Sequence, residues 1–198
     1  MWDERYAGED YLFGTEPNAF LKAQAHRLRP GQRALAVADG EGRNGVWMAE
    51  QGLDVVSMDS SAVGLAKARK LAAARGVALT FVQGDLESWV WEENAFDVVA
   101  VIFIQFAPPP LRARCFEGFK RTLKPGGLLL MTGYGPKQLE YRTGGPGELE
   151  KLYTRKLLEE SFADMDILLL DEHESWMAEG TRHAGMSALI DLVARKRG

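Results

Sequence analysis

The sequence predicts an α/β protein with a doubly wound, mostly parallel, seven-stranded sheet that ends in an antiparallel hairpin. Short apolar runs alternate with helical patterns between residues 34 and 132, and such alternation is typical of parallel strands joined by helices. A glycine-rich turn follows the first apolar run, at the place where doubly wound folds bind their ligands. Beyond residue 162, two strand-like runs have no clear helical pattern between them, which predicts an antiparallel pair at the sheet edge.

Seven apolar runs predict the strands, in chain order. They occupy residues 34–38, 55–58, 79–82, 96–104, 128–132, 165–170 and 184–193. The first three runs are short, which suits buried strands bounded by turns. The run at 96–104 is apolar almost throughout, as expected of a strand that helices cover on both faces. Lys124–Gly127 supplies the turn before the fifth strand, and the last two runs form the hairpin.

The helices are predicted from apolar periodicity and from the residues that start or stop them. They occupy residues 17–28, 44–51, 111–123 and 154–162, with one more after Ser60 and Ser61. Pro30 and Gly31 terminate the first helix, and the second starts after the glycine-rich turn. Ser60 or Ser61 can cap the next helix. The apolar residues that share one face of that helix are Leu65, Ala68, Leu71 and Ala72.

Length and composition indicate one globular domain, residues 1–198, in which residues 1–30 form an N-terminal lid and helix segment. The 198 residues are 46% hydrophobic and 26% charged, as in ordinary globular proteins. The net charge of −4 argues against a nucleic-acid partner. No uncharged apolar run reaches the roughly 20 residues of a membrane helix, and the acidic start is unlike a signal peptide. We therefore expect a cytoplasmic monomer or weak homodimer that acts on a small molecule and has no membrane partner.

The histidine and cysteine residues predict no metal site. Cys115 is the single cysteine, so a zinc site built on cysteine pairs is excluded, and we expect an inert buried thiol. His26, His173 and His183 lack the spacing of metal ligands. We expect these histidines at the surface or in structural hydrogen bonds.

The turn at Asp39–Gly45 carries the pattern G-x-G-x-x-G, and Asp59 ends the next strand. This combination is typical of a nucleoside-cofactor site in which the acid binds the ribose. A nicotinamide dinucleotide would place its pyrophosphate against Asp39 and Glu41, and bringing like charges together is costly. S-adenosylmethionine would instead place a sulfonium and an ammonium group there. Charge therefore favours S-adenosylmethionine.

Several short motifs follow one another in a fixed order. They are Gly40–Asn44, Met58–Ser61 with Gly64–Ala68, Gln83–Leu86, Phe96–Val99 and Leu123–Gly127, preceded by Trp2–Tyr6 and Phe13–Pro17. Together they resemble the class I, Rossmann-like, S-adenosylmethionine-dependent methyltransferases, and within these the bacterial branch of tellurite-resistance-type methyltransferases. The resemblance covers nearly the whole chain and implies the same C-terminal hairpin.

The resemblance also implies a cofactor site along the carboxyl ends of the strands. The residues that it assigns to S-adenosylmethionine are Ala38, Gly40, Glu41, Gly42, Asn44, Asp59, Ser60, Asp85, Leu86 and Phe103. Asp59 would accept hydrogen bonds from both ribose hydroxyls, and Asp85 one from the adenine amino group. The family usually has an acid where this chain has Ala36 and a glycine where it has Ala38. Two alternatives stay open: an NAD(P)-dependent oxidoreductase, and a non-catalytic regulatory protein that binds S-adenosylmethionine.

The acceptor side has three candidate residues, and no dedicated base is required. Methyl transfer from a sulfonium is an in-line displacement that alignment and exclusion of water can promote. Gln105 follows the fourth strand and could orient an acceptor through its amide, or serve only as a polar strand end. Tyr11 belongs to an aromatic N-terminal segment that could enclose a sulfonium or form a hydrophobic lid. Arg142 lies in a glycine-rich loop at 134–147, which we expect to line the acceptor pocket.

Overall fold

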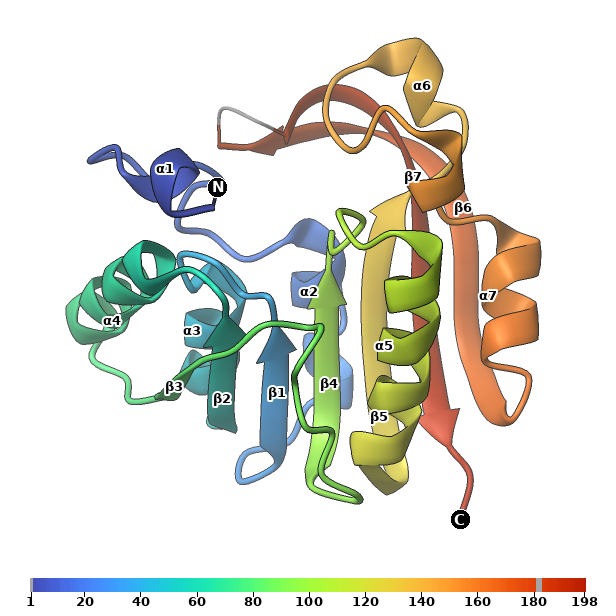
Figure 1. The fold of residues 1–198 in the computed structure, drawn as a ribbon. Helices are drawn as coiled ribbons and strands as arrows, with labels where there is room; N and C mark the ends of the chain where they lie inside the picture. Colours follow the sequence, from blue (N-terminus) through green and yellow to red (C-terminus); the bar gives the residue numbers. More distant parts are fainter. Residues whose placement is uncertain (1, 181–182) are drawn as a thin grey trace.

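A computed structural model describes residues 2–180 and 183–198 of the chain. The strands are β1 (Arg33–Val37), β2 (Asp54–Asp59), β3 (Thr80–Gln83), β4 (Phe96–Ile102), β5 (Leu123–Tyr134), β6 (Met165–Glu179) and β7 (His183–Lys196). They form one seven-stranded sheet in the order β3-β2-β1-β4-β5-β7-β6 (Figure 1). The first five strands are parallel, and β7 is antiparallel to both β5 and β6. The predicted fold class is therefore confirmed.

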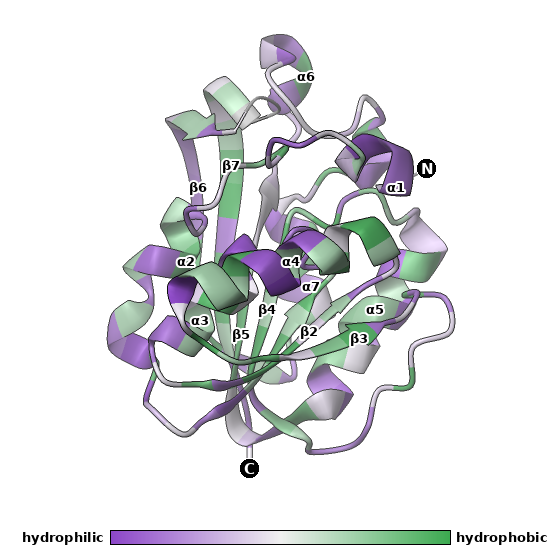
Figure 2. Cartoon of the chain, turned by 90° about the vertical axis from the view of Figure 1, so that its left-hand side faces the viewer, coloured by the Kyte–Doolittle hydropathy of each residue, from purple (hydrophilic) through white to green (hydrophobic). Residues whose placement is uncertain are grey.

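Helices cover both faces of this sheet. They are α1 (Trp2–Tyr6), α2 (Ala19–Ala23), α3 (Arg43–Glu50), α4 (Ala62–Arg75), α5 (Pro109–Thr122), α6 (Gln138–Tyr141) and α7 (Arg155–Ser161), with short 3-10 turns at Ala25–Arg27 and Leu149–Lys151. Figure 1 shows α5 and α7 in front of the sheet and α2 behind it. Figure 2 shows apolar residues concentrated along the strands between these layers, so each face of the sheet has its own core.

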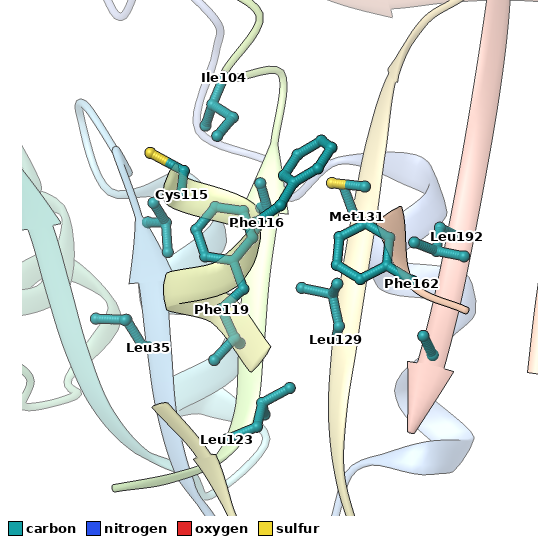
Figure 3. Packing of buried hydrophobic residues seen from close by; sticks show 14 of the residues in the cluster. Leu35, Ile104, Cys115, Phe116, Phe119, Leu123, Leu129, Met131, Phe162 and Leu192 are labelled. Carbon is teal, nitrogen blue, oxygen red and sulfur yellow. The ribbon is translucent and has the colours of Figure 1, made fainter. Parts of the chain in front are cut away.

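The core under α5 and α7 is aromatic and aliphatic. Phe116 and Phe119 of α5 pack with Phe162 against Leu129 and Met131 of β5 (Figure 3). The opposite core places α2 and α3 on small strand residues, and it contains Phe20, Leu21, Trp47, Met48, Ala34 and Ala36. The close packing of two helices on β1 explains why alanines occupy its buried positions on that face.

The α4 helix begins and ends as its sequence predicts. The Ser61 hydroxyl accepts a hydrogen bond from the Gly64 amide at 2.9 Å, so Ser61, rather than Ser60, is the cap. Gly76 ends the helix with φ 69°, a left-handed conformation that glycine adopts without a steric cost. The four apolar residues predicted to share one face, Leu65, Ala68, Leu71 and Ala72, are all buried.

The C-terminal hairpin is longer than the sequence predicts. β6 extends for 15 residues and β7 for 14, because polar residues continue the strands beyond the apolar runs and need no burial on the solvent side. β4, in contrast, ends at Ile102, because Phe103 adopts φ 56° and turns the chain out of the strand. Among the described residues, no helix is long and apolar enough to cross a membrane.

Candidate functional site

The carboxyl ends of β1, β2, β3 and β4 meet along one edge of the sheet, and residues 38–42 form the loop between β1 and α3 there. We call residues 38–42 the glycine loop and residues 2–18 the N-terminal segment. Figure 1 shows that α1, within this segment, lies above the loop, while the end of β6 and the start of β7 arch toward it. The edge at which doubly wound folds bind ligands is thus covered by both.

The glycine loop needs unusual backbone angles and close contacts. Ala38, Gly40 and Gly42 have φ values of 49°, 58° and 87°. A Cβ atom on Gly42 would lie 2.5 Å from the Cβ of Ala68, so α4 packs directly on the loop. A Cβ atom on Gly40 would lie 2.5 Å from the Tyr6 hydroxyl. Ala38 adopts the left-handed conformation despite its side chain, which costs about 1–2 kcal/mol relative to glycine.

Asp59 is held at the end of β2, beside the loop. Its Oδ2 accepts a hydrogen bond from the Gly40 amide at 2.8 Å, and its Oδ1 accepts one from the Ser61 amide at 2.8 Å. Burial raises the pKa of Asp59, and these backbone hydrogen bonds oppose that rise. Each carboxylate oxygen keeps a second lone pair for a ligand hydroxyl. Asp59 therefore lies where the sequence places the ribose.

Asp39 faces the interior and not the open edge. Its carboxylate accepts hydrogen bonds from the Gly45 amide at 3.2 Å and from the Ser57 hydroxyl at 2.7 Å. Burial raises the pKa of Asp39 to about 7. The side chain thereby joins the glycine loop to α3 and β2, and its contacts here are with the protein.

The Glu41 side chain contacts the N-terminal segment and α4. Its Oε1 lies 2.5 Å from Nζ of Lys67, and its Oε2 accepts a hydrogen bond from the Leu12 amide at 2.7 Å. Lys67 also donates to the backbone carbonyls of Tyr6, Gly8 and Asp10 at 3.3, 2.9 and 2.6 Å. The sequence argument expected the carboxylates of Asp39 and Glu41 beside a cationic cofactor, but the structure gives both of them protein partners. The Glu41–Lys67 ion pair instead fastens the segment across the loop.

Aromatic rings of the N-terminal segment run along the site. Tyr6 is buried between the glycine loop and α4, where a Cβ on Gly64 would lie 3.0 Å from its ring. Burial and the nearby carboxylates of Asp59, Glu41 and Asp39 raise the pKa of Tyr6. The ring of Trp2 stacks on Tyr6 at 5.6 Å. Tyr6 belongs to the aromatic N-terminal segment that the sequence predicts could enclose a sulfonium or form a hydrophobic lid.

Tyr11 lies on α4, beside the Glu41–Lys67 ion pair. Its hydroxyl donates to the Lys67 carbonyl at 3.1 Å, and the Lys67 ammonium lies 5.2 Å from its ring centre. Asn44, at the start of α3, accepts a hydrogen bond from the Asn18 amide at 2.9 Å. Both side chains hold the N-terminal segment in place.

The end of β3 lies beside Asp59, because the Gly84 amide donates to the Asp59 carbonyl at 3.0 Å. Asp85 is exposed and accepts a hydrogen bond from the Glu87 amide at 2.8 Å, whereas Leu86 is buried. Ser60 is exposed at the same edge. These three residues lie near the carboxyl ends of β2 and β3, and their role in binding the cofactor stays a prediction.

Gln105 joins the ends of β4 and β5. Its Nε2 donates to the Tyr134 carbonyl at 2.8 Å, and its Oε1 accepts from the Tyr134 amide at 2.5 Å. The ring of Phe103 lies 4.8 Å from the ring of Tyr134. Both polar atoms of the Gln105 amide are therefore bonded to the backbone, and its action on an acceptor stays a prediction. Arg142 is exposed at the end of α6 with φ 55°, and its acceptor role also stays a prediction.

A cavity of about 490 Å³ lies between the N-terminal segment with α2 and the inner face of the hairpin. We call it the hairpin cavity. Glu179 accepts hydrogen bonds from Arg43 at 2.7 Å, from the Asn18 amide group at 3.0 Å and from the Ala19 backbone amide at 3.1 Å. This cluster closes one end of the cavity beside the glycine loop. Sequence reasoning missed the cavity, although the isolated acid Asp191 in an apolar strand is a signal that could have pointed to it.

The remaining candidates behave as structural groups. Cys115 is buried as expected, and burial raises the pKa of its thiol to about 11, which disfavours the reactive thiolate. His26 is exposed, and its Nδ1 lies 3.0 Å from the Ala23 carbonyl. His173 is hydrogen-bonded within the hairpin, while the side chain of His183 lies outside the described part of the chain.

Comparison with known proteins shows a likeness to methyltransferases. Residues 34–127 match the methyltransferase domain family. The demethylmenaquinone methyltransferase of Renibacterium salmoninarum is 33% identical over 130 residues, which cover 65% of this chain and 49% of that protein. The protein-L-isoaspartate O-methyltransferase of Methylorubrum populi is 32% identical over 132 residues, which cover 64% of this chain and 62% of that protein. The chain thus spans about half to three fifths of the length of these relatives.

Solved structures share the fold across the whole chain. A SAM-dependent methyltransferase from Methanosarcina mazei superposes with a TM-score of 0.74 at 17% identity, covering 92% of this chain and 99% of that one. TehB from Haemophilus influenzae superposes with a TM-score of 0.75 at 15% identity, covering 99% of this chain and 66% of that one. These likenesses show the fold, and the β6–β7 hairpin is included in it.

Proposed function

We propose that the chain is a class I S-adenosylmethionine-dependent methyltransferase and that it transfers a methyl group from S-adenosylmethionine to a small molecule. Asp59 is the observation that carries the proposal. Its carboxylate is pinned by two backbone amides directly beside a glycine loop. That arrangement leaves two carboxylate oxygens that could each accept a further hydrogen bond from a ribose diol.

The residues around the loop fit a nucleoside cofactor. At Gly40 a side chain would collide with Tyr6, so Tyr6 can approach the backbone of the loop there only because the residue is glycine. Asp85 and Leu86 lie at the neighbouring strand end, where an adenine ring would reach an exposed carboxylate and a buried apolar side chain. When bound, S-adenosylmethionine supplies a methyl group that its sulfonium already activates. The chain's own task is to hold the reactants in line and to exclude water.

A small acceptor is favoured by the size of the hairpin cavity and by the named relatives. A volume of about 490 Å³ lies in the range of small-molecule sites. Relatives of this chain include a demethylmenaquinone methyltransferase and a phosphoethanolamine N-methyltransferase, whose names specify small molecules. Trp2 and Tyr6 would shield the reacting groups from water, and Arg142 and Gln105 remain the acceptor-side candidates of the sequence.

Calorimetric titration tests the proposal. We expect S-adenosylmethionine and its demethylated product to bind and NAD not to bind. Asp59→Ala should weaken the binding of S-adenosylmethionine by at least about tenfold, since hydrogen bonds to a charged group contribute roughly 1.5–3 kcal/mol each. Asp54→Ala is the matched control, because Asp54 is exposed at the opposite end of β2.

Two results would contradict the proposal in different ways. Binding of NAD alone would identify an oxidoreductase-type site. Binding of S-adenosylmethionine without transfer of a tritiated methyl group to any member of a panel of small molecules, including thiols, halides, metalloid oxyanions and metabolites, would identify a regulatory protein. Unchanged affinity in Asp59→Ala would show that the ribose lies elsewhere.

A further inference from the structure

The inner end of the hairpin cavity carries a connected set of polar side chains from three strands. Nε2 of His173 lies 2.9 Å from Oδ2 of Asp191, and Nδ1 of His173 lies 2.7 Å from the Ser175 hydroxyl. The Thr132 hydroxyl donates to Oδ1 of Asp191 at 2.5 Å. All four residues line the cavity. None of them belongs to the cofactor site described above.

The hydrogen bonds determine where the protons lie. An ionised carboxylate only accepts hydrogen bonds, so Asp191 orients the Nε2–H of His173 toward itself. Nδ1 is then the unprotonated nitrogen, and it accepts a hydrogen bond from the Ser175 hydroxyl. A carboxylate behind an imidazole also stabilises the imidazolium that forms when Nδ1 takes a proton. Burial raises the pKa of Asp191, while the hydrogen bonds from Thr132 and His173 oppose that rise.

This polar end lies at the same edge of the sheet as the glycine loop. Thr132 pairs with Ile102 of β4 on one side and with Asp191 of β7 on the other, so all three are at the carboxyl end of β4. At the opposite wall of the cavity, Arg43 follows directly after Gly42 of the loop. The cavity therefore extends from the cofactor loop to the histidine.

The charges around the cavity disfavour an anionic occupant. Three carboxylates line it, those of Glu16, Glu179 and Asp191, against the two cations Arg43 and Lys22. Arg43 is paired with Glu179, and the two side chains are only 7% and 12% exposed. An oxyanion or halide would find no buried cation free to bind it. The rest of the lining includes apolar side chains such as Phe20, which suit an uncharged molecule.

We propose that the hairpin cavity holds the methyl acceptor, and that this acceptor is an uncharged, largely apolar molecule with a hydroxyl or N–H group. Ser175 and His173 take the proton of that group. The inference rests on the methyl-transfer function proposed above. The acceptor oxygen or nitrogen bonds to the methyl carbon while the carbon–sulfur bond breaks and its electron pair stays on sulfur. The acceptor proton passes to Ser175 as the serine proton passes to Nδ1 of His173. The imidazolium then releases the proton to water, since the His173 side chain is 30% exposed.

The test uses the full chain, a panel of small phenols, indoles and alcohols, and tellurite and iodide as charged probes. Binding is followed by NMR shifts of amides 173–178 with the demethylated cofactor present, and turnover by tritiated methyl transfer. We expect an uncharged panel member to bind in the cavity and to be methylated. His173→Gln and Ser175→Ala should each lower kcat by about a hundredfold or more, as loss of a proton acceptor does, with unchanged affinity for S-adenosylmethionine. His26→Gln is the matched histidine control and should change nothing.

A second variant separates occupancy of the cavity from chemistry. Leu189 lines the cavity on the same face of β7 as Asp191, and Leu189→Trp should narrow it and weaken acceptor binding by more than about tenfold, which is about 1.4 kcal/mol. The inference is overturned if no panel member binds in the cavity or if bound members are not methylated. It is also overturned if His173→Gln methylates as fast as the original protein, or if tellurite or iodide is the methylated probe. Absence of S-adenosylmethionine binding in the original protein would instead overturn the proposed function, whatever occupies the cavity.

Discussion

Replacing Lys67 with methionine should release the N-terminal segment from the glycine loop. The Lys67 side chain is 11% exposed and its partner Glu41 3% exposed, with 2.5 Å between Nζ and Oε1. Lys67→Met keeps the length of the side chain but removes this ion pair and the hydrogen bonds to three carbonyls of the segment. Breaking a buried pair and leaving one charge alone costs about 3–5 kcal/mol. In a domain of this size that corresponds to a fall in Tm of roughly 6–20 °C.

Two measurements test this reasoning. Urea unfolding gives the loss of stability, and hydrogen exchange of the amides in residues 2–14 reports whether the segment opens locally. Lys70→Met, on the exposed face of the same helix, is the control and should change the free energy of unfolding by less than about 0.5 kcal/mol. The double variant Lys67→Met/Glu41→Gln should recover part of the loss, because no buried charge is left unpaired. A loss below about 1 kcal/mol together with unchanged exchange in residues 2–14 would refute the fastening role of the pair.

Three further predictions follow from single side chains. Burial raises the pKa of Asp39 to about 7, above the roughly 3.9 of an unfolded chain. The protonated Asp39 therefore stabilises the fold fully below about pH 4, and this stabilisation is lost as the pH rises to about 7. Urea unfolding between pH 4 and 8 should show a fall in the free energy of unfolding that Asp39→Asn reduces by up to about 4 kcal/mol. Gly42→Ala should lower the free energy of unfolding by about 2–5 kcal/mol, because its Cβ would lie 2.5 Å from Ala68 and φ is 87°. Gly76→Ala should lower it by only about 1–2 kcal/mol, because the position has φ 69° but faces open space. Denaturant midpoints measure both losses. The Cys115 thiol should react with Ellman's reagent no faster than the protein unfolds, so a fast reaction of the native protein would contradict its burial.

The sheet could be predicted from the sequence because each buried strand is a compact apolar run bounded by turn residues. The β1 and β2 runs, with Asp59 at the second strand's end, sufficed to place the glycine loop and its acid at one edge. The length of the hairpin was underestimated because the polar outer half of β6 has no apolar pattern. Pairing with β7 nevertheless continues the strand through Glu179.

The partners of the charged residues could not be predicted in the same way. Asp39 and Glu41 are neighbours of the cofactor loop in sequence, yet one carboxylate turns inward to Ser57 and the other is bound to Lys67. Lys67 lies on the buried side of α4 while Lys70 of the same helix is exposed, and the pattern of charges does not reveal this difference. Likewise, His173 and Asp191 are 18 positions apart, and only the register of β6 and β7 brings them together. Such contacts depend on tertiary packing, which local sequence patterns do not encode.

The Glu179 cluster has a consequence for the order in which the chain matures on the ribosome. Its contacts join Glu179 to Arg43 and Asn18, which are 136 and 161 positions earlier. At roughly 5–20 residues per second, synthesis leaves Arg43 waiting for about 7–27 s and Asn18 for about 8–32 s before Glu179 emerges. The wall of the hairpin cavity is therefore assembled last, after the parallel strands can already have paired. A nascent chain can thus have its cofactor loop in place while the proposed acceptor chamber does not yet exist.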